Sequence, residues 1–325
     1  MALYTKLSKK QIAKLVAPFG LSAPKRIQGI LEGTVNTYYR LDYPQKSYFL
    51  KIDETSNIQR LKRELKVFKI LAANTRRYSF KIPTPLPTLK GKLFVFFGKK
   101  PVLLFETIPG HSANIKTLTY YLLRNSGRAM AQLHRSAGGK KLEKHRFFID
   151  EIFNVYKQIK NKLKVKHPLI DASLRNWLLW MEQNEPNGLP EGLIHADLFA
   201  ENILLQNGRL MGIVDFEAAG RGPFLFDIAV SLHALCHDGK SFSISHSREF
   251  LKGYQSIRKL IPKEKKELEY YLFQSALRFL LTRLRDFELK EGPVKAKPFK
   301  DYREFLKRFS EIPPLLQRIQ HFLHN

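Results

Sequence analysis

A histidine, two aspartates and an asparagine lie within about twenty residues of one another in the 325-residue chain. The segment GLIHADLFAENILL holds His195, Asp197 and Asn202, and Asp215 follows in LMGIVDFE after a turn at QNGR. Unpaired polar groups cost free energy inside an apolar strand, so these side chains either satisfy one another or hold a ligand. A strand–turn–strand hairpin between Asn202 and Asp215 would gather these two residues and Asp197 at one end.

Phosphoryl transfer from a magnesium nucleotide requires this set of groups. Asp197 would orient the acceptor hydroxyl and accept its proton. The amide oxygen of Asn202 and the carboxylate of Asp215 would hold Mg²⁺, a hard cation that prefers oxygen ligands. Glu217, two residues after Asp215 on an extended segment, points the same way. It is therefore a further candidate for the metal, or for a cationic part of the acceptor.

Groups elsewhere in the chain would support this chemistry. Lys51 lies on a predicted strand and Glu64 on the helix after it, and such a pair orients a lysine toward the α- and β-phosphates. Either residue alone would be an ordinary surface charge. We interpret His195 as a structural support of the catalytic loop and Asp227, in FLFDIAV, as a hydrogen-bond partner of its backbone. The candidate phosphate contacts in the loop EGTVNT are Gly33, Thr34, Asn36 and Thr37.

The pattern of apolar residues predicts the elements that must position these groups. The first third reads as β-rich, with a hairpin over 25–31 and 35–41, a strand over 46–53, a helix over 57–73 and a second hairpin ending near 106–110. Beyond it helices dominate, over 117–136, 150–165, 172–183 and 265–290, with short strands around 203–205 and 210–215. We predict an α+β, two-lobed fold, with a nucleotide-clamping lobe over 1–106 and a catalytic and acceptor-binding lobe over 107–325.

The net charge of +27 is unusual, and residues 1–106 contain 21 Lys and Arg against 6 Asp and Glu. Such an excess favours nucleic acid, anionic membranes or phosphate-bearing ligands, but the lysines are scattered, so a solvated surface is the simpler interpretation. No apolar run of about 18 residues occurs, and we expect no membrane span. Cys236 is the only cysteine, which excludes an intrachain disulfide and fits the cytoplasm.

The order H-x-D-x4-N, strand, turn, strand and DF resembles the catalytic loop and metal-binding acid of the protein-kinase-like superfamily. Within that superfamily the chain resembles the aminoglycoside phosphotransferase and choline kinase branch, and more specifically the bacterial type II homoserine kinases. The similarity covers almost the whole length. The segments that carry it include MALYTKLSKKQIAKLVAPFG, IQGILEGTVNTYYRL, FETIPG, GRAMAQLH, SALRFLLTRLRD and KPFKDYREFLKRF.

This resemblance implies a protein-kinase-like fold and ATP- and Mg²⁺-dependent phosphorylation of the hydroxyl of L-homoserine, a step of threonine biosynthesis. A zwitterionic acceptor needs a cation for its carboxylate, and Arg278 and Arg283 are candidates unless they pair with local acids. Glu217 stands where the type II family more often has an aromatic residue, and VDFEAAG is closer to a choline kinase. Choline, ethanolamine or an aminoglycoside therefore stays open as the acceptor, as does a basic nucleotide-binding scaffold without catalysis.

Overall fold

The N-terminal part is a five-stranded antiparallel sheet, as the sequence predicts. The computed structural model describes residues 3–31, 36–136, 142–290 and 300–324. The strand order is β1-β2-β3-β5-β4, so the two hairpins flank β3. The bounds are β1 Arg26–Ile30, β2 Thr37–Asp42, β3 Ser47–Ile52, β4 Val95–Phe97 and β5 Lys100–Glu106, with helices α1 Lys9–Val16 and α2 Ile58–Ala73.

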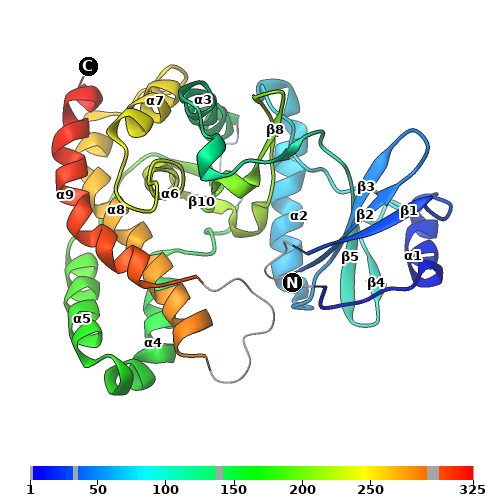
Figure 1. Cartoon of the computed structure of the whole chain (residues 1–325), viewed down its shortest axis with the longest axis horizontal. Helices are drawn as coiled ribbons and strands as arrows, with labels where there is room; N and C mark the ends of the chain where they lie inside the picture. The colour runs from blue at the N-terminus through cyan, green and yellow to red at the C-terminus, as the bar shows by residue number, and fades with distance from the viewer. Residues whose placement is uncertain (1–2, 32–35, 137–141, 291–299, 325) are drawn as a thin grey trace.

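The two faces of this sheet belong to two different cores. Val102 and Leu104 of β5 pack in the smaller core, to which α1 contributes. The alternate residues Leu103 and Phe105 pack with α2 in the main core of the molecule. This alternation follows from the two-residue period of a strand. Figure 1 shows the consequence, with α1 at the outer edge of the molecule and α2 between the sheet and the helical part.

The remainder of the chain is mainly helical, and α6 lies at its centre (Figure 1). Every residue of α6 is buried, which its sequence FLFDIAVSLHAL explains, because a helix that is apolar on all sides needs neighbours on all sides. The four predicted helices are present, although α8 ends at Arg283 and one π-helical turn, Leu284–Glu288, follows it. The helices are α3 Tyr120–Ser136, α4 Ile149–Lys166, α5 Pro168–Gln183, α6 Phe224–Leu235, α7 Ile244–Gln255, α8 Pro262–Arg283 and α9 Arg303–His324.

Five short strands lie between these helices. The predicted hairpin consists of β8 and β9, and β6 pairs with β8 on its outer side. A separate antiparallel pair, β7 with β10, brackets the catalytic segment. The strands β6, β7 and β10 were not predicted from the sequence, because with two to four residues each they show no measurable period. The bounds are β6 His111–Ser112, β7 Glu191–Ile194, β8 Ile203–Gln206, β9 Arg209–Ile213 and β10 Gly220–Pro223.

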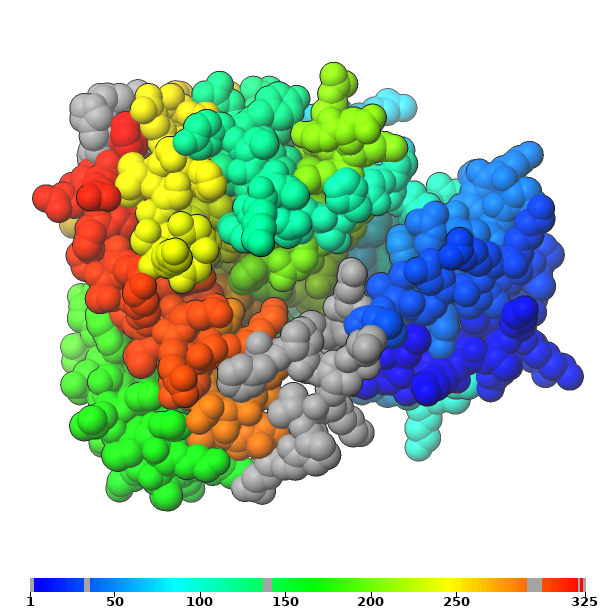
Figure 2. All heavy atoms as spheres, in the orientation of Figure 1, coloured from blue at the N-terminus to red at the C-terminus, as the bar shows by residue number. Residues whose placement is uncertain are grey.

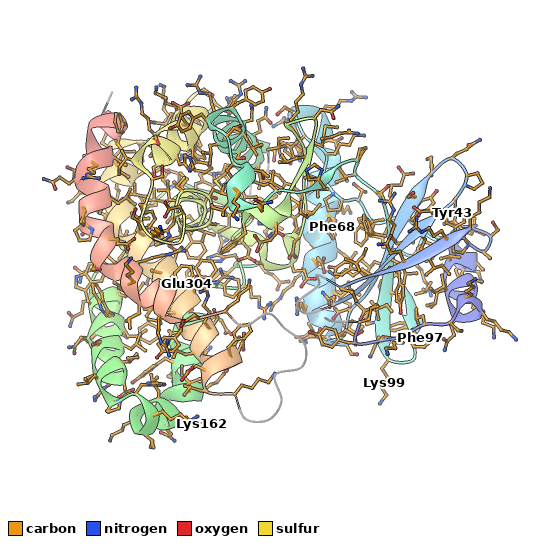
Figure 3. The ribbon with its side chains drawn as sticks, in the orientation of Figure 1. Tyr43, Phe68, Phe97, Lys99, Lys162 and Glu304 are labelled. Carbon is orange, nitrogen blue, oxygen red and sulfur yellow. The ribbon has the colours of Figure 1, made fainter. Side chains whose placement is uncertain are left out.

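The N-terminal part, which contains the five-stranded sheet, projects from the mainly helical remainder of the molecule (Figure 2). Phe68 of α2 lies at the junction (Figure 3), with its ring centroid 6.3 Å from that of Phe216. Lys81 also crosses the junction: its N–H donates to Met211 O at 2.8 Å, and its carbonyl accepts from Ile213 N at 3.0 Å. Residues before position 106 thus make contacts with the second part, and the division of the chain at residue 106 stays a prediction. Among the described residues, no helix is both long and apolar enough to cross a membrane.

Candidate active site

Lys51 binds two buried carboxylates at the junction of the two parts. Its Nζ lies 2.8 Å from Glu64 of α2, the predicted partner, and 2.8 Å from Glu217 of the second part. Lys51 is 3% exposed and Glu64 5%. Burial alone lowers the pKa of the Lys51 ammonium, but Glu217 and Glu64 outweigh it and raise that pKa well above its usual value. The ammonium is therefore charged, and it faces the place where phosphates are expected.

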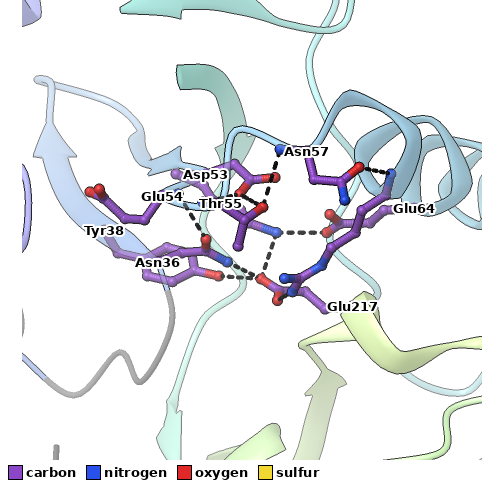
Figure 4. A network of polar contacts seen from close by, with 10 residues as sticks. Asn36, Tyr38, Asp53, Glu54, Thr55, Asn57, Glu64 and Glu217 are labelled. Carbon is purple, nitrogen blue, oxygen red and sulfur yellow. Dashed lines mark hydrogen bonds and ion pairs between the residues drawn. The ribbon is translucent and has the colours of Figure 1, made fainter. Parts of the chain in front are cut away.

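Glu217 is surrounded by donors from the N-terminal part (Figure 4). Asn36 donates its amide to Glu217 Oε1, the Tyr38 hydroxyl lies 3.4 Å from the same oxygen, and Arg60 pairs with Oε2. Burial favours the neutral acid, yet Lys51 and Arg60 lower the pKa of Glu217 to about 2. Arg60 is not among the site residues predicted from the sequence. Its position four residues before Glu64, on the same face of α2, was the available signal.

The structure brings only part of the predicted phosphate loop to the site. Gly33 and Thr34 lie outside the described residues. Asn36 faces Glu217, but Thr37 does not: its hydroxyl donates to Glu54 at 2.6 Å and accepts from Thr5 N at 3.1 Å. The reason is strand alternation, because Tyr38 lies opposite Lys51 in the sheet and Thr37 points to the other face. The prediction that the Thr37 side chain contacts the phosphates is therefore corrected: its hydroxyl lies on the opposite face of the sheet.

The catalytic loop begins directly after β7, and Asp227 of α6 holds its backbone. The Asp227 carboxylate accepts from His195 N at 2.8 Å and from Ala196 N at 2.7 Å. Ala196 has φ of 63°, an uncommon conformation for a residue with a side chain, and these bonds fix it. The His195 ring contacts Val214 O at 2.9 Å. His195 and Asp227 thus have the supporting positions that the sequence predicts.

Two further contacts orient the polar groups of the loop. Asn202 donates its amide to Asp197 O at 2.8 Å, which leaves the Asn202 Oδ1 available as an acceptor. Arg278 Nη1 lies 2.9 Å from the Asp197 carboxylate. Its guanidinium carbon is 3.5 Å from the ring centroid of Phe147 and 3.9 Å from that of Phe279, so the cation is held between two aromatic side chains.

Asp215 has the properties of a cation ligand. It has φ of 65°, and among the described residues no group donates a hydrogen bond to its carboxylate. Desolvation between the two parts, and then the charges of Glu217 and Asp197, raise the pKa of Asp215 to about 7. Within the described residues no cluster of three or more His, Cys, Asp or Glu forms a complete metal site. Mg²⁺ bound with a nucleotide needs few protein ligands, because phosphates and water supply the rest, so Asp215 and Asn202 fit it.

Comparison with known proteins identifies the family. The model of the phosphotransferase enzyme family matches residues 26–260. The chain belongs to this family. It is 29% identical over 313 residues to homoserine kinase of Phenylobacterium zucineum (strain HLK1), with 95% of each chain covered. It is 30% identical over 310 residues to homoserine kinase of Parvibaculum lavamentivorans (strain DS-1), again with 95% of each covered. The protein is an ATP-dependent small-molecule kinase, as the sequence predicts.

Solved structures show the same fold. A spectinomycin phosphotransferase in complex with ADP and spectinomycin has a TM-score of 0.68 at 17% identity, covering 97% of this chain and all (100%) of that one. An amicoumacin kinase in complex with AMP-PNP and Ca²⁺ has a TM-score of 0.69 at 16% identity, covering 97% of this chain and 94% of that one. The protein-kinase-like, α+β fold predicted from the sequence is thereby confirmed.

Two cavities of this phosphotransferase have catalytic groups on their walls. The first, of about 270 Å³, is mostly apolar and carries Lys51 and Asp215 on its wall; we call it the nucleotide cavity. Its apolar wall includes Phe49, Phe105 and Leu204, a lining that suits a flat purine ring. The second, of about 190 Å³, has Asp197 on its wall and lies beside the end of α8. We call it the acceptor cavity.

Both arginines predicted to bind the acceptor line the acceptor cavity, but both already have acid partners. Arg278 binds Asp197, as described above. Arg283 lies 2.8 Å from Glu304. The alternative that these arginines pair with local acids is therefore what the structure shows.

Proposed function

We propose that this kinase transfers the γ-phosphoryl group of ATP to the hydroxyl of L-homoserine, giving O-phospho-L-homoserine, with Mg²⁺ bound to the nucleotide. In that role it would act in the cytoplasm, in threonine biosynthesis. The curated relatives named above support this acceptor, since the similarity extends over 95% of the chain. The proposed division of labour follows the lobes, with residues 1–106 clamping the nucleotide and residues 107–325 holding the acceptor.

The charge of the acceptor cavity carries the proposal. Cationic side chains on its wall outnumber acidic ones, five to three. A polycationic aminoglycoside or a quaternary amine would meet net repulsion there, whereas an acceptor with a carboxylate gains attraction. The cationic residues are Arg146, Arg278, Arg283, Arg285 and Lys300, and the acidic ones are Asp197, Glu201 and Asp286.

The mechanism assigns one task to each group. Asp197, fixed by Arg278, accepts a hydrogen bond from the acceptor hydroxyl and aims its oxygen at the nucleotide cavity. Lys51, oriented by Glu64, neutralises phosphate charge. Mg²⁺, when bound, supplies further charge neutralisation for the phosphates.

Asn202, Asp215 and Glu217 are the residues that would hold this metal ion. Because the transition state of phosphoryl transfer is loose, positioning and charge neutralisation provide most of the rate.

The decisive test is an acceptor panel with the wild-type protein and Asp197→Ala. We expect ADP release to be fastest with L-homoserine, ahead of choline, ethanolamine and an aminoglycoside. We also expect Asp197→Ala to lower kcat at least about 1,000-fold while AMP-PNP still binds. Glu269→Ala, which removes an exposed acid on α8, is the control and should keep full activity. Faster turnover of choline, or activity of Asp197→Ala within about tenfold of wild type, would overturn the proposal.

A further inference from the structure

The acceptor cavity has more charged groups than the reaction needs, and most of them already have a partner of opposite charge. Three of its arginines hold acids at salt-bridge distance. The pairs are Arg278 with Asp197 at 2.9 Å, Arg283 with Glu304 at 2.8 Å and Arg285 with Asp286 at 2.7 Å. Each of these guanidinium groups already has an acid partner, although the buried Nε of Arg278 has no hydrogen-bond partner among the described residues. They are therefore poorer candidates for binding a ligand carboxylate than an arginine without an acid partner.

Arg146 is different. Its side chain is exposed on the wall of the acceptor cavity, and its guanidinium carbon lies 5.4 Å from the ring centroid of Phe147. Among the residues that the structure describes, no carboxylate lies within salt-bridge distance of it. Partial loss of hydration beside the protein, and then the nearby charge of Arg60, lower the pKa of Arg146. A ligand carboxylate would therefore meet a guanidinium for which no acid of the described residues competes.

Arg146 also lies where the carboxylate of an acceptor would need a cation. It is on the wall of the acceptor cavity and of a neighbouring cavity that Glu217 borders. The charges of Arg60 and Arg285, as well as those of Glu217 and Asp286, act on it. Arg146 therefore borders both cavities. In a four-carbon hydroxy acid the carboxylate lies about 5 Å from the hydroxyl, so both can be held within one small cavity.

Glu201 is the corresponding acid. It belongs to the 3-10 turn Ala200–Asn202, between the two catalytic-loop residues, and lines the acceptor cavity. Its side chain is exposed, and among the described residues it has no cation at salt-bridge distance. An ammonium group would find in Glu201 the one acid of the wall that no arginine neutralises in the described part of the chain.

We infer that Arg146 binds the carboxylate and Glu201 the ammonium group of an α-amino acid acceptor whose side chain carries the reacting hydroxyl. This inference rests on the proposed function and assigns its specificity to two residues other than Arg278 and Arg283. A planar guanidinium suits a carboxylate, because two parallel N–H groups can meet its two oxygens.

Three acceptors isolate the two contacts: L-homoserine, 4-hydroxybutanoate, which lacks the ammonium, and 3-aminopropan-1-ol, which lacks the carboxylate. Arg146→Gln should raise KM about 10- to 100-fold for the two acceptors with a carboxylate, the range of a lost charge-assisted contact. It should leave kcat/KM for 3-aminopropan-1-ol within about twofold. Glu201→Gln should weaken the two amines about three- to tenfold and spare 4-hydroxybutanoate.

Binding and folding controls complete the experiment. Calorimetry of L-homoserine with the AMP-PNP-bound protein should show the same loss for Arg146→Gln without turnover. Arg318→Gln, which removes an exposed guanidinium on α9, is the matched control and should match wild type. An equal loss by Arg146→Gln on all three acceptors, or a raised KM for ATP instead, would overturn the inference. The proposed function would survive that result, provided that wild type still prefers L-homoserine.

Discussion

Replacing Lys51 with methionine tests the ion-pair cluster at the centre of the site. The substitution keeps the length of the side chain and removes the ammonium that lies 2.8 Å from both Glu64 and Glu217. Glu217 keeps Arg60 as a partner. Glu64 is left, among the described residues, without a cation at salt-bridge distance, in surroundings where it is only 5% exposed. The cost of the substitution should therefore fall mainly on Glu64.

The size of that cost depends on pH. A buried carboxylate without a partner takes up a proton, so the penalty cannot exceed the cost of protonation. From a usual pKa of 4.5, protonation costs about 3.4 kcal/mol at pH 7 and about 0.7 kcal/mol at pH 5, at about 1.36 kcal/mol per pH unit. In the variant, Glu64 has a higher pKa in the folded than in the unfolded state. The free energy of unfolding is therefore reduced above pH 4.5, and this reduction becomes smaller as the pH falls. Burial already raises the pKa of Glu64 in the wild type, so we expect losses of at most about 3 kcal/mol at pH 7 and at most about 1 kcal/mol at pH 5.

Urea unfolding of the nucleotide-free protein at pH 7 and pH 5 measures these losses. Lys46→Met is the matched control: Lys46 lies 2.9 Å from Glu106, but their side chains are 61% and 53% exposed, so less than about 1 kcal/mol should be lost. Adding Glu64→Gln to Lys51→Met should restore most of the stability at pH 7. A loss that is equal at both pH values, or no larger than that of Lys46→Met, would refute the reasoning.

Two further predictions concern the metal and the helical part. The pKa of Asp215 is about 7 without a metal, and the ionised form is the one that binds; Mg²⁺ affinity in the presence of AMP-PNP should therefore fall toward tenfold per pH unit below pH 7. Calorimetry should detect proton release on binding at pH 6.5, and its persistence in Asp215→Asn would contradict the assignment. Gly253→Ala on α7 places a methyl carbon 1.9 Å from Arg124 O of α3 and should lower the free energy of unfolding by about 1–3 kcal/mol. Lys252→Ala, exposed beside it, should change little.

Local patterns predicted much of the fold. The strands of the first sheet, α2 and the β8–β9 hairpin follow from alternation, helical spacing and turn residues, which act over a few neighbouring positions. The same locality explains what was missed. The short strands β7 and β10 bracket the catalytic loop, but each has four residues, and their pairing brings together positions about 30 residues apart.

The site divides in the same way. The sequence predicts that Asp197, Asn202 and Asp215 lie together, because a single hairpin connects the segments that carry them. Thr37 was misassigned because its face of β2 depends on the register with β3, which places Tyr38 opposite Lys51. The salt-bridge partner of Arg278 could not be predicted from the sequence, because Asp197 lies 81 positions earlier in the chain. Sequence spacing identifies which residues could act, while tertiary packing decides which of them are already occupied.

Glu217 shows why this distinction matters for the reaction. Its carboxylate comes from the second part of the molecule, and the groups that bind it, Lys51, Arg60 and Asn36, come from the first. The structure thus places a carboxylate in the cationic pocket where phosphate oxygens would compete for the same donors. Incoming phosphates would release Glu217 beside Asp215, where a metal ion supplies the positive charge that it has lost. We therefore propose that an acid at this position would join the two parts and, once phosphates took its donors, would serve as a metal ligand, a role that an aromatic residue could not fill.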